Sequence, residues 1–178
     1  MRKFLDLALK GNCNVVEHLS TSPIYSTPEF LKIKELLISN LGKKGLYNSY
    51  KGMAIFNYKK FIASGRKNSL KKYLYVFRAL MSGIYVLETG KIEPNLEKLA
   101  RHFHSPLIKR LIRLKRKGKD KDELPSSIDN GKLENEILKL LKRLDRDYLK
   151  SKLPDTPSRE IREEAERFLI KMRRKELE

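Results

Sequence analysis

The stretch KKYLYVFRALMSGIYVL, residues Lys71–Leu87, is the longest strongly apolar run of the chain. Within it Leu74, Phe77, Met81 and Ile84 recur at steps of three and four residues, which places them on one face of a helix. A helix that is apolar over most of its girth lies in the middle of a domain. The stretch therefore predicts a central helix around which the other helices pack.

A second face of the same predicted helix is polar. It carries Lys71, Tyr75, Arg78 and Ser82. A buried cation is costly unless an anion meets it. Two interpretations stay open: Lys71 and Arg78 extend from a core helix to solvent, or they receive a phosphate group.

The rest of the chain also has helical periodicity, without the alternation of a strand. Thr27-Pro28 and Thr156-Pro157 each predict a helix that begins with a threonine cap and a proline. Gly42 and Gly45 predict a turn before the next helix. The sequence thus predicts an all-α fold, a helical bundle of about six to eight helices around the central apolar helix. The other helical segments include Met1–Lys10, Asn12–Leu19, Tyr47–Ile62, Lys132–Lys150 and a last helix to about Lys175.

The length of 178 residues suits one domain, or one domain with an appendage. We expect a core helical domain over residues 1–117 and a polar loop over residues 118–131. Residues 132–178 are then two C-terminal amphipathic helices that pack on the core.

The chain carries 40 Lys and Arg residues against 22 Asp and Glu residues, a net charge of +18. This excess indicates a polyanionic partner, namely nucleic acid, nucleotide phosphates or an anionic membrane surface. A proteome-wide bias toward lysine is the competing explanation. One cysteine, Cys13, excludes an intramolecular disulfide and suits a reducing compartment, so we expect a cytoplasmic protein. No apolar run has the length of a membrane helix, so no membrane-spanning segment is predicted. Of the three polyanions we expect nucleotide or RNA as the partner, and not a membrane.

The most basic segment is Arg101–Lys121, which holds nine Lys or Arg residues and one acid, a net charge of +8. Leu107, Ile108, Leu111 and Leu114 would face the core. Because no interleaved acids relieve the repulsion, this segment predicts an anion-binding face, and a merely solvated face is the alternative. The basic residues expected to point outward are Lys109, Arg110, Arg113, Arg116 and Lys117.

Catalytic and metal-binding patterns are not evident. His102 and His104 point to different sides of a helix and make a poor chelate. Asp145 and Asp147 diverge in the same way and are expected to be solvated. Glycine-rich phosphate loops are absent from the sequence. We therefore predict no catalytic residue and no metal ligand in this chain.

The order of segments nevertheless resembles one family, the predicted nucleotidyltransferases of the DNA-polymerase-β-like superfamily that are often encoded beside RNA ligases. The resemblance covers nearly the whole chain, and its most specific part is KGNxNxxE followed by KKYLYVxRxL. The matching segments are RKFLDLALKGNCNVVEHL with SPIY (Arg2–Leu19, Ser22–Tyr25), YKGMAIFNYKKFI (Tyr50–Ile62), KKYLYVFRALMSGIYV (Lys71–Val86), the KGKxxxELP loop (Lys117–Pro125) and LPDTP (Leu153–Pro157).

In that family a Gly-Ser motif and a metal-binding Asp-x-Asp lie on a mixed sheet upstream of the LKGN segment. The resemblance therefore implies the helical C-terminal part of such an enzyme, without the catalytic half. Mg²⁺ with a nucleoside triphosphate is expected only if that half is supplied elsewhere. The resemblance also implies that Lys72 and Arg78 contact the triphosphate or the acceptor. Lys71, on the polar face of the same helix, is added as a candidate for binding nucleotide or RNA phosphates.

Four further residues are candidates for shaping the site. The resemblance implies this role for Asn12, Asn14 and Glu17, and helix capping or core hydrogen bonding is the alternative for each. Asn57 is added because it interrupts an apolar stripe and needs hydrogen-bond partners if it is buried.

The leading hypothesis is a nucleotidyltransferase-family protein, the helical part that binds nucleotide or RNA and depends on carboxylates from another chain or segment. The alternative is a non-catalytic basic module that binds nucleic acid or a protein partner. A third option is a degenerate or antitoxin-like protein with an exposed apolar face, which would self-associate or bind a separate catalytic subunit.

Overall fold

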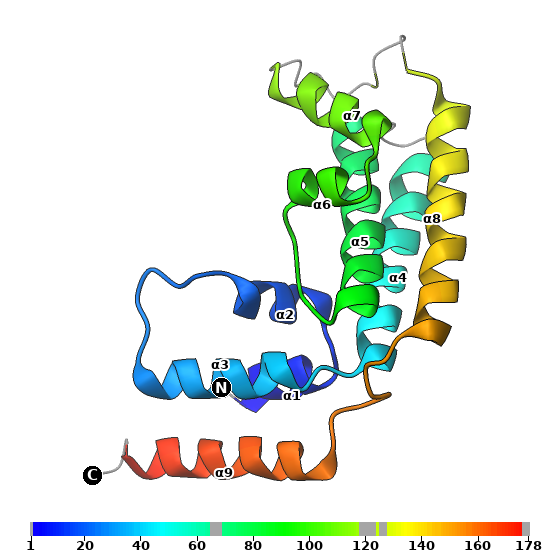
Figure 1. Ribbon diagram of the computed structural model, residues 1–178. Helices are drawn as coiled ribbons and strands as arrows, with labels where there is room; N and C mark the ends of the chain where they lie inside the picture. Colours follow the sequence, from blue (N-terminus) through cyan, green and yellow to red (C-terminus); the bar gives the residue numbers. More distant parts are fainter. Residues whose placement is uncertain (1, 65–68, 118–123, 125–127, 176–178) are drawn as a thin grey trace. The chain divides into compact units, whose positions relative to one another are not determined.

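Helices make up all regular structure in the computed structural model, which describes residues 2–64, 69–117, 124 and 128–175 (Figure 1). The all-α prediction is confirmed. These residues form nine α-helices and one π-helical segment, more than the six to eight expected, because several short segments are separate helices. The elements are α1 (Arg2–Leu9), α2 (Cys13–Ser20), α3 (Pro28–Ser39), α4 (Lys43–Asn57), η1 (Tyr58–Ala63), α5 (Leu70–Thr89), α6 (Leu96–His102), α7 (Pro106–Arg116), α8 (Asn130–Lys150) and α9 (Arg159–Lys175).

The chain divides into two compact units. The first combines Met1–Ser49 with Lys152–Glu178, and the second is Tyr50–Ser151. This grouping reflects internal packing. The division into residues 1–117, 118–131 and 132–178 expected from the sequence stays a prediction.

The first unit contains α1, α2, α3 and α9. Helix α1 packs on α2, α2 packs on α3, and α9 packs on both α1 and α3. Their apolar faces form one core, as the periodicity predicted. The core residues are Leu5, Ala8, Leu19, Ile33, Leu37, Ala165 and Leu169.

Local caps delimit several helices of this unit. The Asn12 side chain accepts a hydrogen bond from Val15 N (3.2 Å) and caps α2. Thr27 caps α3 through Phe30 N (3.2 Å), with Pro28 as the first helical residue.

The start of α4 differs from the predicted one. The turn expected at Gly42–Gly45 is shorter, and the helix already begins at Lys43. The backbone N–H groups of Lys43 and Lys44 donate to the carbonyl oxygens of Pro154 (2.9 Å) and Asp155 (3.1 Å). A distant segment thus satisfies the first turn of the helix, whose N–H groups lack partners within it.

The start of α9 is also a correction. Thr156-Pro157 does not open the helix, which begins at Arg159. Pro157 is buried, and a Cβ atom on Gly42 would lie only 2.8 Å from its Cδ atom. The Ser158 hydroxyl takes the capping position and accepts from Ile161 N at 3.5 Å.

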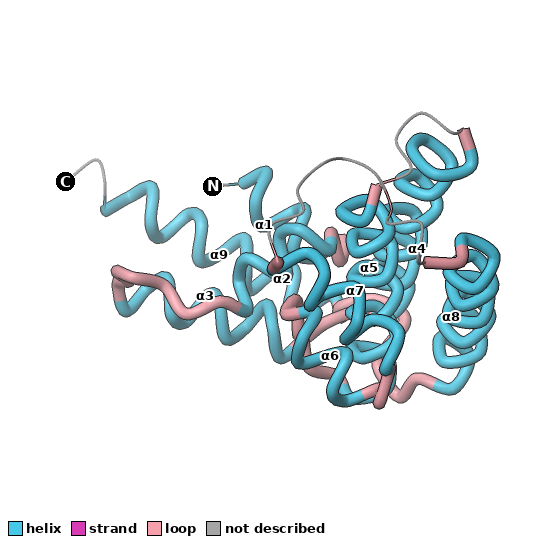
Figure 2. Tube along the Cα trace, turned by 90° about the horizontal axis from the view of Figure 1, so that it is seen from above, coloured by secondary structure: helices cyan, strands magenta, loops and turns pink. Residues whose placement is uncertain are grey.

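The second unit is organised around α5, as predicted from Lys71–Leu87. Helix α5 packs against α8, α6, α7 and η1, and Figure 2 shows it between α8 on one side and α6 and α7 on the other. Tyr73, Val76, Phe77, Leu80 and Ile84 are fully buried. The helix ends where Gly90 adopts a left-handed conformation (φ 71°).

The helix predicted over Tyr47–Ile62 changes form within its length. Its last part is the π-helical segment η1. At the junction the Asn57 amide donates to Met53 O at 2.8 Å, one turn back in α4. Such π segments interrupt α-helices in short pieces and are frequent at functional sites.

Asp147 on α8 is a further correction. It was expected to be solvated, but it is buried between two arginines. Its carboxylate accepts from Arg143 Nε (3.3 Å) and Arg146 Nε (3.1 Å). Asp145 is half-buried and pairs with Lys51 Nζ at 2.8 Å. These ion pairs place both carboxylates in structural roles.

Helices long and apolar enough to cross a bilayer do not occur among the described residues.

Candidate functional site

Helices α6 and α7 hold the basic residues of the segment Arg101–Lys117. Ser105 caps α7 by accepting from Ile108 N at 3.4 Å, and Pro106 is its first residue. Ile108 and Leu111 are fully buried and anchor one face of α7. The helical period then turns the basic side chains of α7 to its outer side.

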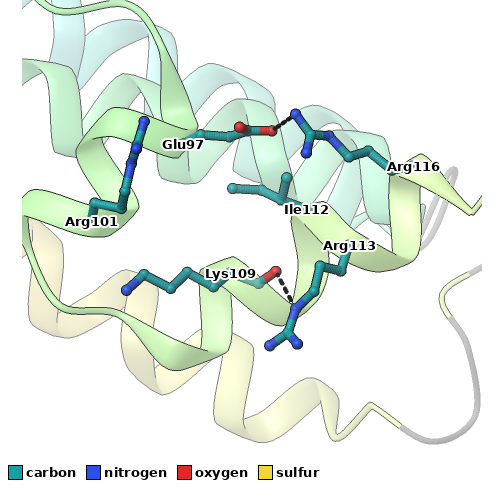
Figure 3. A pocket seen from close by; sticks show the side chains of 6 residues that line it. All are labelled: Glu97, Arg101, Lys109, Ile112, Arg113 and Arg116. Atoms are coloured by element: carbon teal, nitrogen blue, oxygen red, sulfur yellow. Dashed lines mark hydrogen bonds and ion pairs between the residues drawn. The ribbon is translucent and has the colours of Figure 1, made fainter.

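A pocket of about 340 Å³ lies between these two helices (Figure 3). Four of the six residues that line it are cations, one is an acid, and Ile112 is apolar. Glu97 forms an ion pair with Arg116. Because four positive charges face one negative charge, the pocket attracts anions. The lining residues are Glu97, Arg101, Lys109, Ile112, Arg113 and Arg116.

The structure brings together three of the five basic residues that were expected on this face. Lys109, Arg113 and Arg116 line the pocket. Arg110 and Lys117 are exposed and are not among its lining residues.

Two charged lining residues were not predicted as site residues, and neither was the apolar Ile112. Arg101 and Glu97 come from α6, which the Asn95 side chain caps by accepting from Glu97 N (2.9 Å) and Lys98 N (3.2 Å). Arg101 was counted only as part of the basic segment. Its charge was the available signal, but its placement in the same pocket as Arg113 depends on how α6 packs on α7.

The three cations predicted on α5 lie in different surroundings. Lys71 is exposed, with its Nζ atom 5.9 Å from the ring centroid of Tyr75. Lys72 is half-buried, and its Nζ atom lies 3.6 Å from the ring centroid of Phe61. Arg78 is half-buried and its Nη2 atom lies 3.9 Å from Met53 Sδ. Their predicted role toward phosphates stays a prediction.

The four site-shaping candidates also have defined positions. Asn12 caps α2, Asn14 is exposed and Glu17 is buried on the same helix. Asn57 bonds back to its own helix. The capping and hydrogen-bonding roles of Asn12 and Asn57 match the alternatives considered for them, and a role in shaping a site stays a prediction for all four.

A buried polar group lies between η1, α5 and α8. Tyr58 hydrogen-bonds Glu134, and partial burial together with this carboxylate raises the pKa of Tyr58. Burial, together with Glu134 and Tyr58, raises the pKa of Tyr73 to about 12. Both phenols are therefore neutral at physiological pH.

The described residues do not fit a magnesium ion. Groups of three or more His, Cys, Asp or Glu side chains that would hold a metal are absent from this part of the chain. Glu97, the carboxylate of the basic pocket, is engaged by Arg116.

An apolar pocket of about 380 Å³ lies within the first unit. Phe4, Phe30, Ile33, Phe168 and Met172 are among its lining residues. An apolar pocket of this kind is the type of surface that the hypothesis of a protein partner requires.

Two comparisons place the chain among known proteins, and no solved structure matches it. Residues 1–171 match the family described as RNA repair pathway DNA polymerase beta family, RlaP. An uncharacterized protein of Methanocaldococcus jannaschii is 30% identical over 159 residues, covering 88% of this chain and 63% of the relative. The chain thus spans less than two thirds of the length of that relative.

Proposed function

Since this chain belongs to the RNA repair pathway DNA polymerase beta family, we propose that it acts as the helical, phosphate-binding part of a nucleotidyl-transfer enzyme. The single observation that carries the proposal is the basic pocket, in which Arg101, Lys109, Arg113 and Arg116 surround a space of about 340 Å³. Arginine pairs with phosphate oxygens through two parallel N–H donors, which suits a pocket in which three of the four cations are arginines.

The ligand that we assign to this pocket is the phosphate backbone of RNA. Its contribution is to hold the acceptor strand, while carboxylates from another chain or segment would carry Mg²⁺ with the nucleoside triphosphate. The family placement supports this assignment, and the charge of the pocket supports the binding of phosphates. The resemblance to the RNA-ligase-associated group belongs to the same proposal.

The test is binding of a fluorescent single-stranded RNA, followed by anisotropy over a series of salt concentrations. The variant Arg101→Gln/Arg113→Gln removes two charges from the pocket. We expect weaker binding and a salt dependence whose logarithmic slope falls by about 0.7 for each phosphate that the variant no longer neutralises. A matched control is Arg173→Gln/Arg174→Gln on α9, which removes the same charge from exposed positions outside the pocket.

Equal losses of affinity in the two variants would mean that net charge alone drives binding, and the pocket assignment would then be wrong. Unchanged binding in both variants would also overturn it. Circular dichroism melting of each variant shows whether the fold is retained.

The alternative, a non-catalytic basic module, rests on the net charge of +18, which attracts a polyanion without any catalytic group. It differs from the leading proposal in one observable. A module of this kind binds nucleic acid with a steep salt dependence and shows no preference for nucleoside triphosphates.

A further inference from the structure

Aromatic and lysine side chains alternate along a surface formed by the end of α4, by η1 and by the start of α5. Lys60 Nζ lies 5.0 Å from the ring centroid of Phe56 and 5.4 Å from that of Phe61. Lys72 Nζ follows, 3.6 Å from Phe61 and 5.9 Å from Tyr75. We name this surface the aromatic–lysine strip; in order its residues are Phe56, Lys60, Phe61, Lys72, Tyr75 and Lys71.

Two of the three rings are open to solvent. Phe56 is 58% exposed and Tyr75 is 41% exposed, whereas Phe61 is half-buried. The π-helical segment begins directly after Asn57, and its wider turn redirects the side chains that follow. Lys60 thereby contacts both phenylalanine rings.

The lysines of the strip have rings as partners in the described part of the chain, and ion pairs with carboxylates are not seen there for Lys60, Lys71 or Lys72. The local sequence explains this, because residues 36–87 hold ten Lys or Arg residues and no Asp or Glu. An ammonium over a ring face gains only modestly at an exposed site, so these groups remain available to an anion.

This pattern matches the chemistry of an unpaired strand. Every base offers a flat face that stacks on an exposed aromatic ring, and every nucleotide adds a phosphate that an ammonium neutralises. Rings and cations alternate along the strip as bases and phosphates alternate along the strand. A duplex keeps its bases stacked inside and presents only phosphates.

We propose that the aromatic–lysine strip binds single-stranded RNA by stacking unpaired bases on Phe56 and Tyr75, with Lys60, Lys71 and Lys72 on the flanking phosphates. This inference adds recognition of bases to the phosphate binding proposed for the pocket between α6 and α7. It is carried by different residues and does not depend on that pocket.

The test compares two fluorescent probes, an oligoadenylate and an abasic ribose-phosphate oligomer of equal length. The two probes carry the same phosphates, and only the first has bases. We expect the full chain to bind the oligoadenylate more tightly, by about fivefold to a hundredfold for each stacked base. The variant Phe56→Leu/Tyr75→Leu is expected to lose this preference while it binds the abasic probe like the unchanged protein.

Tyr25→Leu is the matched control, because Tyr25 is 84% exposed and lies outside the strip. It should keep the full preference. Thermal unfolding of the double variant checks the fold, which we expect to persist because both rings are open to solvent.

Equal affinity of the full chain for the two probes would overturn the inference, and so would a double variant that keeps the preference. The pocket variant Arg101→Gln/Arg113→Gln is expected to weaken binding of both probes equally. If the pocket variant binds like the unchanged protein and the preference for the oligoadenylate is present, only the proposal for the pocket is refuted. If the pocket variant binds more weakly and the full chain shows no preference for the oligoadenylate, only the proposal for the strip is refuted.

Discussion

Lys43 donates its backbone N–H to the carbonyl oxygen of Pro154 at 2.9 Å, although the two residues lie in distant parts of the sequence. The bond joins the first turn of α4 to the segment that precedes α9. Gly42 and Gly45 flank Lys43 and Lys44, and both lie against other backbone. The absence of side chains at these glycines is therefore a condition for the packing of the first unit.

Gly45→Ala tests this packing. A Cβ atom on Gly45 would lie 2.1 Å from Lys10 O, so backbone must move. We expect a loss of about 1–3 kcal/mol or more in the free energy of unfolding, measured by urea denaturation. Gly52→Ala is the control, because a Cβ atom there meets nothing within 4 Å. It should stabilise the protein by about 0.5–1 kcal/mol, since alanine favours the helix. Equal effects at the two glycines would contradict the argument.

Asp147→Ala tests the buried carboxylate of α8. The change removes the partner of Arg143 and Arg146 and opens space beside α5. We expect the free energy of unfolding to fall by about 1–3 kcal/mol, because each arginine loses its hydrogen bond to Asp147. Asp145→Ala removes a more exposed carboxylate, paired with Lys51, and should cost no more than about 1 kcal/mol. Chemical denaturation of the two variants decides whether burial, rather than the ion pair as such, sets the cost.

The raised pKa of Tyr73 leads us to expect that the free energy of unfolding falls at high pH. Burial raises its pKa from 10.0 to about 12, so the folded state keeps a proton that the unfolded state releases first. The contribution is complete below pH 10 and disappears as the pH rises from about 10 to 12, by up to about 2–3 kcal/mol in total. Tyr73→Phe removes the titrating group and should flatten this part of the stability profile. Urea midpoints measured over that range, for both proteins, provide the check, and parallel profiles would refute the assignment.

Lys72→Gln/Arg78→Gln tests the nucleotide-binding role that the sequence implies for α5. Calorimetric titration of the full chain with ATP and Mg²⁺ is expected to show saturable binding, which the double variant weakens by about tenfold or more. Lys139→Gln/Lys142→Gln on α8 removes the same charge at exposed positions and should leave the titration unchanged. If the titration of the unchanged protein shows no heat of binding, nucleotide binding is refuted. The non-catalytic basic module would then be the better hypothesis.

The candidate site was predictable only in part. The charge run identified Lys109, Arg113 and Arg116, because they follow one another along a single helix with an apolar opposite face. Arg101 and Glu97 join them from α6, and no periodic signal links two helices across a turn. The contact of Lys72 with Phe61 could not be predicted from the sequence either. Phe61 lies in the π-helical segment η1 and Lys72 in α5, so no single helical periodicity relates the two residues.

The sequence by itself determined the all-α class, the central helix Lys71–Leu87 and the start of the helix that Thr27-Pro28 opens. These features depend on side-chain periodicity and on hydrogen bonds within one turn, so neighbouring residues suffice to specify them.

Only the tertiary structure decided where α4 and α9 begin, that Asp147 is buried, and which cations share a pocket. The first turn of α4 donates to the distant Pro154 and Asp155, and Pro157 packs beside Gly42. The pocket depends on how α6 packs on α7, so packing between helices outweighs the local preference. Helix ends, buried charges and shared surfaces therefore required the folded chain.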